Sequence, residues 1–229
     1  MKKLSKRLQT EKAKINKATF YDIEGAIDLV KNTASSKFNE SIEAHISLNI
    51  DPKYADQQLR NTVILPHGTG KILKIAVLVS QERIAEAKEA GADVFGNEDL
   101  IEEISKGNLN FDLLIATADM MPKLAKLGRV LGPKGLMPSP KAGTVTSNLN
   151  NTIQEFKRGK LEYRADKTGI VHISFGKANF SEIQLIENLK AFYNSVEKNK
   201  PSGVKGKYLK KLTICSTMGP GICINFESF

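Results

Sequence analysis

The sequence predicts a two-domain α/β protein. The expected fold is a discontinuous α+β domain of the split β-α-β type, with an antiparallel sheet and two helices, into which a three-layer, Rossmann-like α/β domain is inserted. Three observations lead to it: strand-type alternation at residues 41–50, short apolar runs alternating with helical segments between residues 72 and 116, and a capped amphipathic helix at residues 181–199. A chain of 229 residues is long enough for two small domains.

The expected domain boundaries are two glycine-containing linkers. Residues 1–67 and 160–229 are expected to form the discontinuous domain, and residues 68–159 the inserted one. Hinges are expected near residues 66–70 and 157–160, with residues 156–160 forming the second linker and Gly68, Gly70 and Gly159 as the flexible positions. Because few contacts need to cross such a boundary, a hinge motion is expected.

The charge of the chain predicts an acidic partner, most often a nucleic acid. The formal net charge is +9 and the pI is near 9.4. Residues 68–159 hold 12 basic and 11 acidic residues, so the rest of the chain holds 22 and 14 and carries a net +8. A polyanion is therefore expected to bind the terminal segments. No apolar run approaches the roughly 18 residues of a membrane span, so no membrane partner is expected.

The first 65 residues begin with a basic arm and continue with one helix and two strands. Residues 1–17 hold seven basic residues and one acidic residue, which fits a solvated flexible arm and also an arm that orders on RNA. Residues 22–33 have apolar side chains at helical spacing after Asp22, a candidate N-cap. Residues 41–50 alternate like a half-buried strand, and residues 62–65 form a second short strand.

The inserted segment has a β-α-β-α-β pattern but no nucleotide-binding loop. Buried strands are expected at residues 72–79, 92–95 and 113–116, helices at 82–90 and 98–106, and a short helix at 121–127. The GTGK of residues 68–71 is not a phosphate loop, because Leu65 and Ile72 stand where Gly and Ser or Thr are required. The first strand is followed by Ser80-Gln81-Glu82 instead of a glycine-rich turn, so no dinucleotide and no other cofactor is expected.

Residues 127–144, LGRVLGPKGLMPSPKAGT, hold four glycines and three prolines and cannot be a continuous helix. They lie in a window without acidic residues, from 120 to 154. Arg129, Lys134 and Lys141 give this window a basic surface that could approach phosphates. An ordinary irregular surface loop is the alternative.

The last third of the chain is expected to return to the first domain. Residues 161–165 and 170–175 predict a hairpin around residues 166–169. Residues 181–199 predict a helix with a Ser181–Gln184 capping box. Its apolar stripe comprises Leu185, Leu189, Phe192 and Val196. After a basic loop at residues 201–207, strands are expected at 209–215 and 222–226.

Two short segments have the chemistry of an RNA-binding surface. Ser36, Lys37, Phe38 and Asn39 combine a cation, an aromatic ring and polar donors, although Phe38 could instead be a core residue. Residues 216–221 place glycines on both sides of Pro220 next to Met218, although a plain β-turn would look the same.

Catalysis and metal binding are not expected. His45, His67 and His172 accompany no nucleophile motif, and the spacing of histidines and cysteines along the chain is not that of metal ligands. Cys215 and Cys223 are interpreted as small buried residues of a protein in a reducing compartment. The basic start precedes no apolar signal core and no long leader, so the protein is expected to be made where it works.

Five segments resemble the ribosomal protein L one family, in family order and over essentially the whole chain. They are LGRVLGPKGLMPSPKAGT (127–144), PKYADQQLR (52–60), LPHGTGK (65–71), EYRADKTGIVH (162–172) and STMGPG (216–221). The resemblance implies a non-catalytic structural protein on the mobile stalk of the large ribosomal subunit, which binds large-subunit rRNA. It also implies transient contact with exit-site tRNA, assistance in the release of deacylated tRNA, and binding of the protein's own mRNA as a translational repressor.

The resemblance also implies which residues contact RNA. In the terminal domain these are Lys37, Phe38, Glu43, Arg164, Asp166, Lys167, His172, Thr217, Met218 and Gly219. The inserted domain would make secondary contacts, for which Arg129, Lys134 and Lys141 are the candidates. Asn39 departs from the family, where many relatives have Asp.

Two further expectations concern the location and the competing function. The expected location is the ribosome of a plastid stroma, for an organelle-encoded gene, or of a bacterial cytoplasm. The competing hypothesis, a nucleotide-dependent enzyme, is disfavoured by the missing glycine-rich turn and the incomplete phosphate loop.

Overall fold

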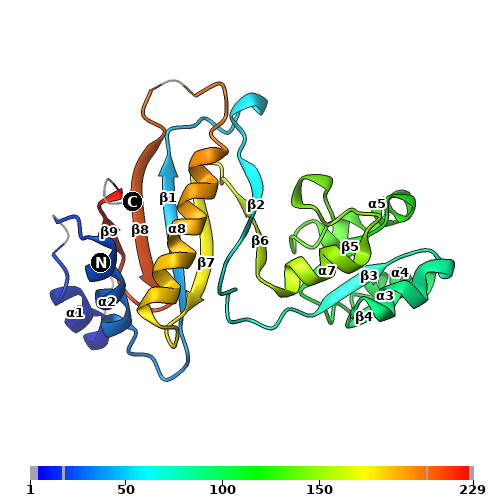
Figure 1. Ribbon diagram of the computed structural model, residues 1–229, viewed down its shortest axis with the longest axis horizontal. Coiled ribbons are helices and arrows are strands. Elements are labelled where there is room, and N and C mark those ends of the chain that lie inside the picture. Colours follow the sequence, from blue (N-terminus) through cyan, green and yellow to red (C-terminus); the bar gives the residue numbers. More distant parts are fainter. Residues whose placement is uncertain (1–4, 17–18, 205, 227–229) are drawn as a thin grey trace. The chain divides into compact units, whose positions relative to one another are not determined.

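The structure is a computed structural model that describes residues 5–16, 19–204 and 206–226. It has a mixed α/β fold, as the sequence predicts (Figure 1). The chain divides into two compact units. Unit 1 comprises Met1–Gly70 and Leu161–Phe229, and unit 2 comprises Lys71–Lys160. None of the described helices has the length and apolar composition that crossing a bilayer requires.

Unit 1 is built on a four-stranded sheet in the order β7-β1-β8-β9. Its strands are β1 (Ser41–Leu48), β7 (Ile170–Lys177), β8 (Leu209–Ser216) and β9 (Ile222–Ile224). Strand β1 is antiparallel to both β7 and β8, so these two strands run parallel to each other on either side of it. Helix α8 (Glu182–Lys198) connects them, which gives the split β-α-β topology.

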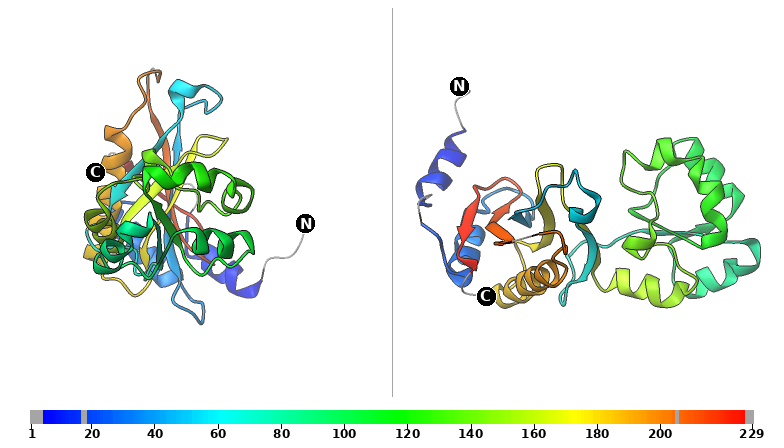
Figure 2. Two further views of the ribbon diagram at one scale, coloured as in Figure 1. Left: turned by 90° about the vertical axis from the view of Figure 1, so that its right-hand side faces the viewer. Right: turned by 90° about the horizontal axis from the view of Figure 1, so that it is seen from above.

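The two faces of this sheet differ in chemistry. On one face, Ile42, Ala44, Ile46 and Leu48 of β1 are at most 1% exposed and belong to the core that α2 (Ile23–Thr33) and α8 complete. Figure 1 shows α8 in front of β1 and β7, and the right-hand view of Figure 2 shows this helix on one side of the sheet. The alternate side chains form the other face, which we call the open face. It comprises Glu43, His45, Ser47, His172, Ser174, Thr213 and Cys215, all partly or largely exposed.

Helix α8 begins as predicted from its sequence. The Ser181 hydroxyl accepts from the Gln184 amide over 3.3 Å, and the Gln184 side chain accepts from the Ser181 amide over 3.0 Å, so the capping box is complete. The predicted apolar stripe is fully buried, with Leu185, Leu189, Phe192 and Val196 each 0% exposed. Local signals therefore define both the start and the buried face of this helix.

Ser181→Ala is expected to lower the free energy of unfolding by about 1 kcal/mol, because the Gln184 amide loses its acceptor. Urea denaturation followed by circular dichroism measures this change. Ser202→Ala, in an exposed turn, is the matched control and should change stability by less than about 0.5 kcal/mol. Equal effects of the two substitutions would contradict a stabilising role of the cap.

The predicted hairpin at residues 161–175 is wrong. Strand β6 (Lys160–Arg164) pairs with β2 (Arg60–Ile64) in a separate two-stranded sheet, and only the bridge between Ala165 and Val171 links it to β7. The Asp166 carboxylate accepts from the Thr168 and Ile170 amides, each over 2.8 Å, and turns the chain. Each strand is thus left to pair with a distant partner, β6 with β2 and β7 with β1.

Part of the basic arm is a helix, whereas a flexible arm was one of the two structures expected for it. Helix α1 (Lys6–Ala13) begins at Ser5, whose hydroxyl accepts from the Leu8 amide over 3.3 Å. Glu11 is 5% exposed and pairs with Lys14 over 3.0 Å. Residues 1–4 and 17 of the predicted arm lie outside the described residues. A one-turn helix, η1 (Ala55–Gln57), is the other short element of this half of unit 1.

Unit 2 is a three-layer α/β unit. Its parallel sheet has the order β4-β3-β5, from β4 (Val94–Gly96), β3 (Ile75–Leu78) and β5 (Leu113–Ala116). One core lies between the sheet and α4 (Glu98–Ser105), α5 (Met121–Ala125) and α6 (Gly128–Leu131), and the other between the sheet and α3 (Ile84–Glu89) and α7 (Leu149–Lys157). Single turns η2 (Gln81–Arg83), η3 (Ala118–Met120) and η4 (Pro140–Ala142) complete it.

Three expectations for unit 2 need correction. The first strand begins at Ile75, because Ile72 is 93% exposed. The second strand of unit 2, β4, is a partly exposed edge strand and not a buried one, because Phe95 is 37% exposed. Helix α7 was not predicted, and it contains Phe156, which is 3% exposed in the unit 2 core instead of lying in a linker.

Candidate RNA-binding surface

Two loops at one end of the unit 1 sheet are joined by a buried carboxylate. We call residues 34–40 and 217–221 the end loops. Glu40 is 1% exposed, and its carboxylate accepts from the Ser36 amide over 3.0 Å and from the Met218 amide over 2.9 Å. The Thr217 hydroxyl accepts from the Ser41 amide over 3.0 Å, and the Thr217 amide donates to the Ser41 carbonyl over 3.0 Å. Loops about 180 residues apart in sequence are thus held side by side.

The environment of Glu40 keeps this carboxyl ionised. Burial by itself would raise its pKa, but the Met218 and Ser36 amides donate to the carboxylate and outweigh burial, so the pKa of Glu40 lies below its ordinary value. A buried charge is costly unless it is hydrogen-bonded, and here backbone amides supply those bonds. Sequence inspection passed over Glu40 because its partners come from both end loops.

The end loops present apolar and cationic side chains to solvent. Phe38 is 55% exposed and Met218 is 50% exposed, and Lys37 and Thr217 are exposed as well. The alternative that Phe38 belongs to the core is therefore wrong. Gly219 packs closely on Ser216, because a Cβ at this position would have to displace the Ser216 hydroxyl.

A further basic residue reaches the end loops from α1. The Arg7 guanidinium donates to the Met218 carbonyl over 2.8 Å and to the Ser35 hydroxyl over 3.2 Å. Part of the N-terminal basic segment is therefore attached to the candidate surface. Nothing in the local sequence around Arg7 distinguishes it from the other basic residues of this segment.

On the open face, four polar side chains form a chain of contacts across three strands. His45 Nδ1 lies 2.8 Å from His172 Nδ1, and His45 Nε2 lies 3.2 Å from the Cys215 sulfur. Asp166 follows, with its carboxylate 3.6 Å from His172 Nε2. These residues, with Glu43, extend the surface from the end loops along the sheet. Arg164 and Lys167, exposed around the 166–169 turn, mark its other end.

The pKa values of the ionisable groups on the open face are shifted in different directions. Hydrogen bonds from the Ile170 amide and the Thr168 hydroxyl lower the pKa of Asp166 to about 2. Burial, with a smaller effect of the neighbouring His172, lowers the pKa of His45. Burial, with a smaller effect of Glu43, raises the pKa of Cys215 to about 11. Cys215 and Cys223 are both free and partly exposed, so their interpretation as buried residues is wrong.

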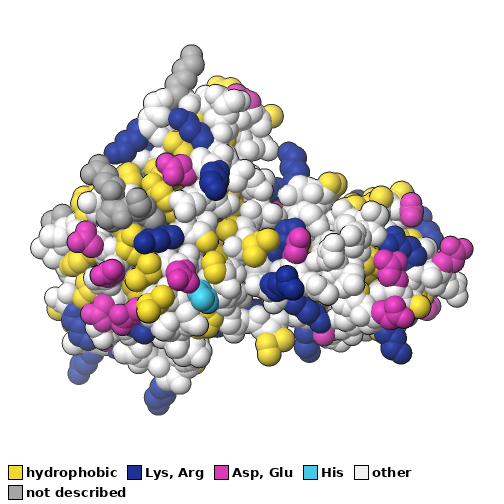
Figure 3. Space-filling model, viewed as in Figure 1, with side chains coloured by type: hydrophobic (Ala, Val, Ile, Leu, Met, Phe, Trp, Pro, Cys, Tyr) yellow, Lys and Arg dark blue, Asp and Glu magenta, His cyan; other side chains and the backbone are white. Residues whose placement is uncertain are grey.

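The basic candidates of unit 2 lie on an irregular surface, as the glycines and prolines predict. Arg129 in α6, Lys134 in the following turn and Lys141 in η4 are all exposed. Gly135 and Gly143 have φ of 70° and 67°, which other residues adopt at a cost. On the face shown in Figure 3, acidic and basic side chains are interspersed over unit 2, in agreement with its small net charge.

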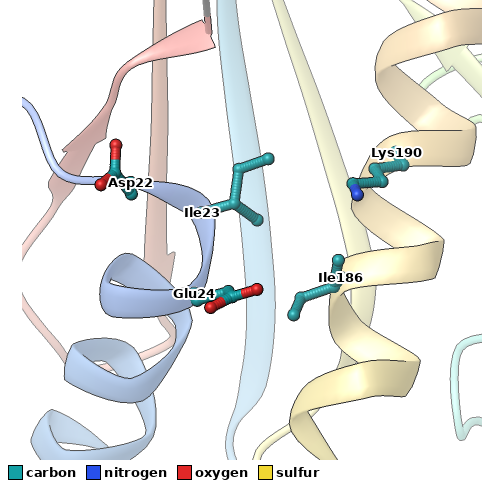
Figure 4. Close-up of a pocket in the computed structure, with 5 residues that line it drawn as sticks. All are labelled: Asp22, Ile23, Glu24, Ile186 and Lys190. Carbon is teal, nitrogen blue, oxygen red and sulfur yellow. The ribbon is translucent and has the colours of Figure 1, made fainter. Parts of the chain in front are cut away.

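A pocket also lies on the helical side of unit 1, between α2 and α8. It is lined by Asp22, Ile23, Glu24, Ile186 and Lys190 (Figure 4). The two carboxylates at the start of α2 make it an unfavourable place for a phosphate group. The candidate RNA-binding surface is therefore the end loops together with the open face.

Comparison with known proteins shows relatives that match this chain over its full length. The sequence profile of the ribosomal protein L1p/L10e family matches residues 30–220. The large ribosomal subunit protein uL1c of Trieres chinensis is 62% identical over 229 residues, with both chains fully covered. The large ribosomal subunit protein uL1 of Prochlorococcus marinus (strain MIT 9515) is 62% identical over 228 residues, covering 100% of this chain and 97% of the relative. The uL1c protein of Phaeodactylum tricornutum is 59% identical, again over the full length of both.

Proposed function

The chain belongs to the ribosomal protein L1p/L10e family, and from this membership we propose that it binds large-subunit rRNA through the end loops and the open face of unit 1. Its relatives are structural proteins of the large ribosomal subunit, which confirms that the chain is not an enzyme. Plastid-type and cyanobacterial relatives place it in the ribosome of a plastid or of a bacterium.

The observation that carries the proposal is the convergence of distant segments on one surface. Residues 37–38, 164–172 and 217–219 come from three parts of the chain. Unit 1 places 37–38 and 217–219 at one end of the four-stranded sheet, and His172 on its open face, which leads to the 166–169 turn at the other end. An exposed aromatic ring, a flexible apolar side chain and cations are side-chain types that single-stranded and looped RNA contacts. Most of the net positive charge also lies outside residues 68–159.

In this mechanism the protein provides a rigid platform for RNA and catalyses no reaction. Phe38 would stack on an unpaired base, Lys37 would contact phosphates, and the narrow turn at Gly219 would let the RNA approach the backbone. The bonds of Glu40 hold these groups in place before the RNA arrives, which reduces the entropy lost on binding.

The same proposal assigns roles beyond rRNA binding. Unit 2 would make secondary RNA contacts through Arg129, Lys134 and Lys141, assist the release of deacylated tRNA from the exit site, and move about hinges at Gly68, Gly70 and Gly159. Of these glycines, Gly68 is attached to α8, because its carbonyl accepts from the buried Asn188 side chain over 2.9 Å. The movement would therefore occur beyond Gly68. Repression of the protein's own mRNA would use the same unit 1 surface.

Titration against a stalk-region rRNA fragment and a scrambled RNA tests the proposal. Phe38→Ala is expected to weaken binding to the stalk fragment by about 10- to 100-fold, because one stacking contact contributes about 1–3 kcal/mol. Met218→Ala should weaken it less. Ile183→Ala is the matched control, because Ile183 is 69% exposed on α8, the helix on the other face of the sheet.

The titration is repeated at several salt concentrations, since the slope reports how many phosphates the basic residues contact. Tight binding of the stalk fragment alone, weakened by Phe38→Ala and not by Ile183→Ala, would support the proposal. Equal binding of both RNAs with Phe38→Ala silent would mean a generic basic surface and would overturn it.

A further inference from the structure

We propose that Glu43, His45 and Cys215 form a binding site for a divalent transition-metal ion of the zinc class on the open face of unit 1. Their candidate ligand atoms, a carboxylate oxygen, an imidazole nitrogen and the sulfur, all lie within 4.8 Å of one another. The proposal stands on this geometry and does not depend on the proposed function.

The register of the sheet brings the three ligands together. Glu43 lies directly opposite Cys215 in the β1–β8 pair, and His45 is two residues further along β1 on the same face. His45 Nε2 and the Cys215 sulfur are already 3.2 Å apart. Zinc binds nitrogen and oxygen at about 2.0–2.2 Å and sulfur at about 2.3 Å, so tetrahedral ligand atoms stand about 3–4 Å apart. Small side-chain rotations would therefore be enough to admit an ion.

A second observation is the way His45 is oriented. Its Nδ1 is 2.8 Å from His172 Nδ1, while His172 Nε2 is 3.6 Å from the Asp166 carboxylate. With both rings neutral and the Nε2 proton of His172 directed toward Asp166, His172 Nδ1 accepts the Nδ1 proton of His45. The lone pair of His45 Nε2 then points at Cys215. Metal-binding histidines are commonly held in this way, with the second ring nitrogen donating to a fixed acceptor.

The ligand set selects the kind of ion. Thiolate and imidazole suit zinc and its neighbours, whereas magnesium and calcium prefer oxygen ligands alone. The ion would replace the thiol proton of Cys215, which is released to solvent. A divalent ion would also balance the charges of Glu43 and the thiolate, two anions on a face proposed to meet RNA. Because the three side chains are partly exposed, a fourth position stays accessible to water.

The sequence prediction of no metal site missed this cluster. It relied on the spacing of histidines and cysteines along the chain, whereas Glu43 and His45 lie on β1 and Cys215 lies about 170 residues later on β8. The sequence indicates this site only through the alternation of polar and apolar residues along the two strands. Glu43 and His45 occupy the polar positions of one strand, and Cys215 occupies a polar-face position of another.

Titration of the tag-free protein with Co²⁺ tests the site, because a cobalt–thiolate bond gives a charge-transfer band that other ligands do not. Wild type and Cys223→Ser should show this band saturating at about one equivalent and lost on adding Zn²⁺. Cys223 is the matched control, a second free and partly exposed cysteine on the neighbouring strand β9. Cys215→Ser should abolish the band, and His172→Ala should weaken metal binding by about 10- to 100-fold.

Circular dichroism of each variant verifies that the fold is intact. A band of equal strength in Cys215→Ser and wild type would mean an adventitious surface site, and the absence of saturable binding in wild type would mean no site. Either result overturns the proposal. An unchanged affinity in His172→Ala would overturn the orienting role given to that residue.

Discussion

Glu40→Ala is expected to lower the free energy of unfolding by about 1–3 kcal/mol and to weaken binding of the stalk-region rRNA fragment by more than about 10-fold. The substitution leaves the Ser36 and Met218 amides without their acceptor and removes the link between the end loops. The second effect arises because Phe38 and Met218 would no longer be held in one arrangement before binding. Urea denaturation and RNA titration of the same preparation measure the two quantities.

Glu40→Gln separates the charge from the geometry. Glutamine keeps one acceptor oxygen, so this variant should lose less stability and less RNA affinity than Glu40→Ala. The pH dependence gives a further test, because the folded-state pKa of Glu40 lies below its ordinary value of 4.5. Because its folded-state pKa is lowered, the ionised Glu40 contributes its full stabilisation above about pH 4.5. This contribution is lost as the pH falls through the folded-state pKa. This component of acid sensitivity should be absent in Glu40→Gln, and its persistence would contradict the role given to the carboxylate.

Phe192→Ala is expected to lower the free energy of unfolding by about 3–5 kcal/mol, the largest effect predicted for this chain. Phe192 is 0% exposed in the middle of α8 and packs edge-on against Tyr163 of β6, with ring centroids 5.7 Å apart. Removing the ring loses its burial and leaves a cavity among α8 and the strands around it. Thermal and urea denaturation measure the loss.

The matched control is Ile183→Ala on the same helix. Ile183 is 69% exposed, so its truncation should change stability by less than about 0.5 kcal/mol. RNA affinity measured well below the unfolding transition should stay within about twofold of wild type in both variants, because neither residue lies in the end loops or the open face. A small loss of stability in Phe192→Ala would mean that the core of unit 1 repacks around the missing ring.

The parts of the fold that the sequence predicted are those with a local signal. Strand β1 has an uninterrupted alternation of period two, and α8 has both a capping box and a stripe of period near 3.6. In unit 2, β5 was predicted at its observed bounds because its apolar run is short and bounded by polar residues. In such segments the local pattern and the tertiary environment favour the same structure.

The parts that the sequence missed depend on distant partners. Strand β6 pairs with β2 instead of its neighbour β7, and no local pattern encodes that choice. The same reason hid Glu40, whose role depends on an amide 178 residues away, and the contact between Arg7 and Met218, 211 residues apart. The chemistry of their segments and the family resemblance identified Phe38 and Met218 as candidates, but only the fold shows that their two loops are joined through Glu40.

The central position of β1 has a consequence for how the chain folds during its own synthesis. Strand β1 leaves the translating ribosome early, yet the hydrogen bonds at its edge reach partners up to 176 residues later. At about 5–20 residues per second, the strand would wait roughly 10–35 seconds for β8. Until β7, α8 and β8 follow, Ile42, Ile46 and Leu48 would have only the N-terminal part of their core to pack against, whereas the parallel sheet of Lys71–Lys160 needs only residues within its own segment. The inserted unit is therefore expected to fold first, and the nascent β1 is the segment most dependent on protection from aggregation.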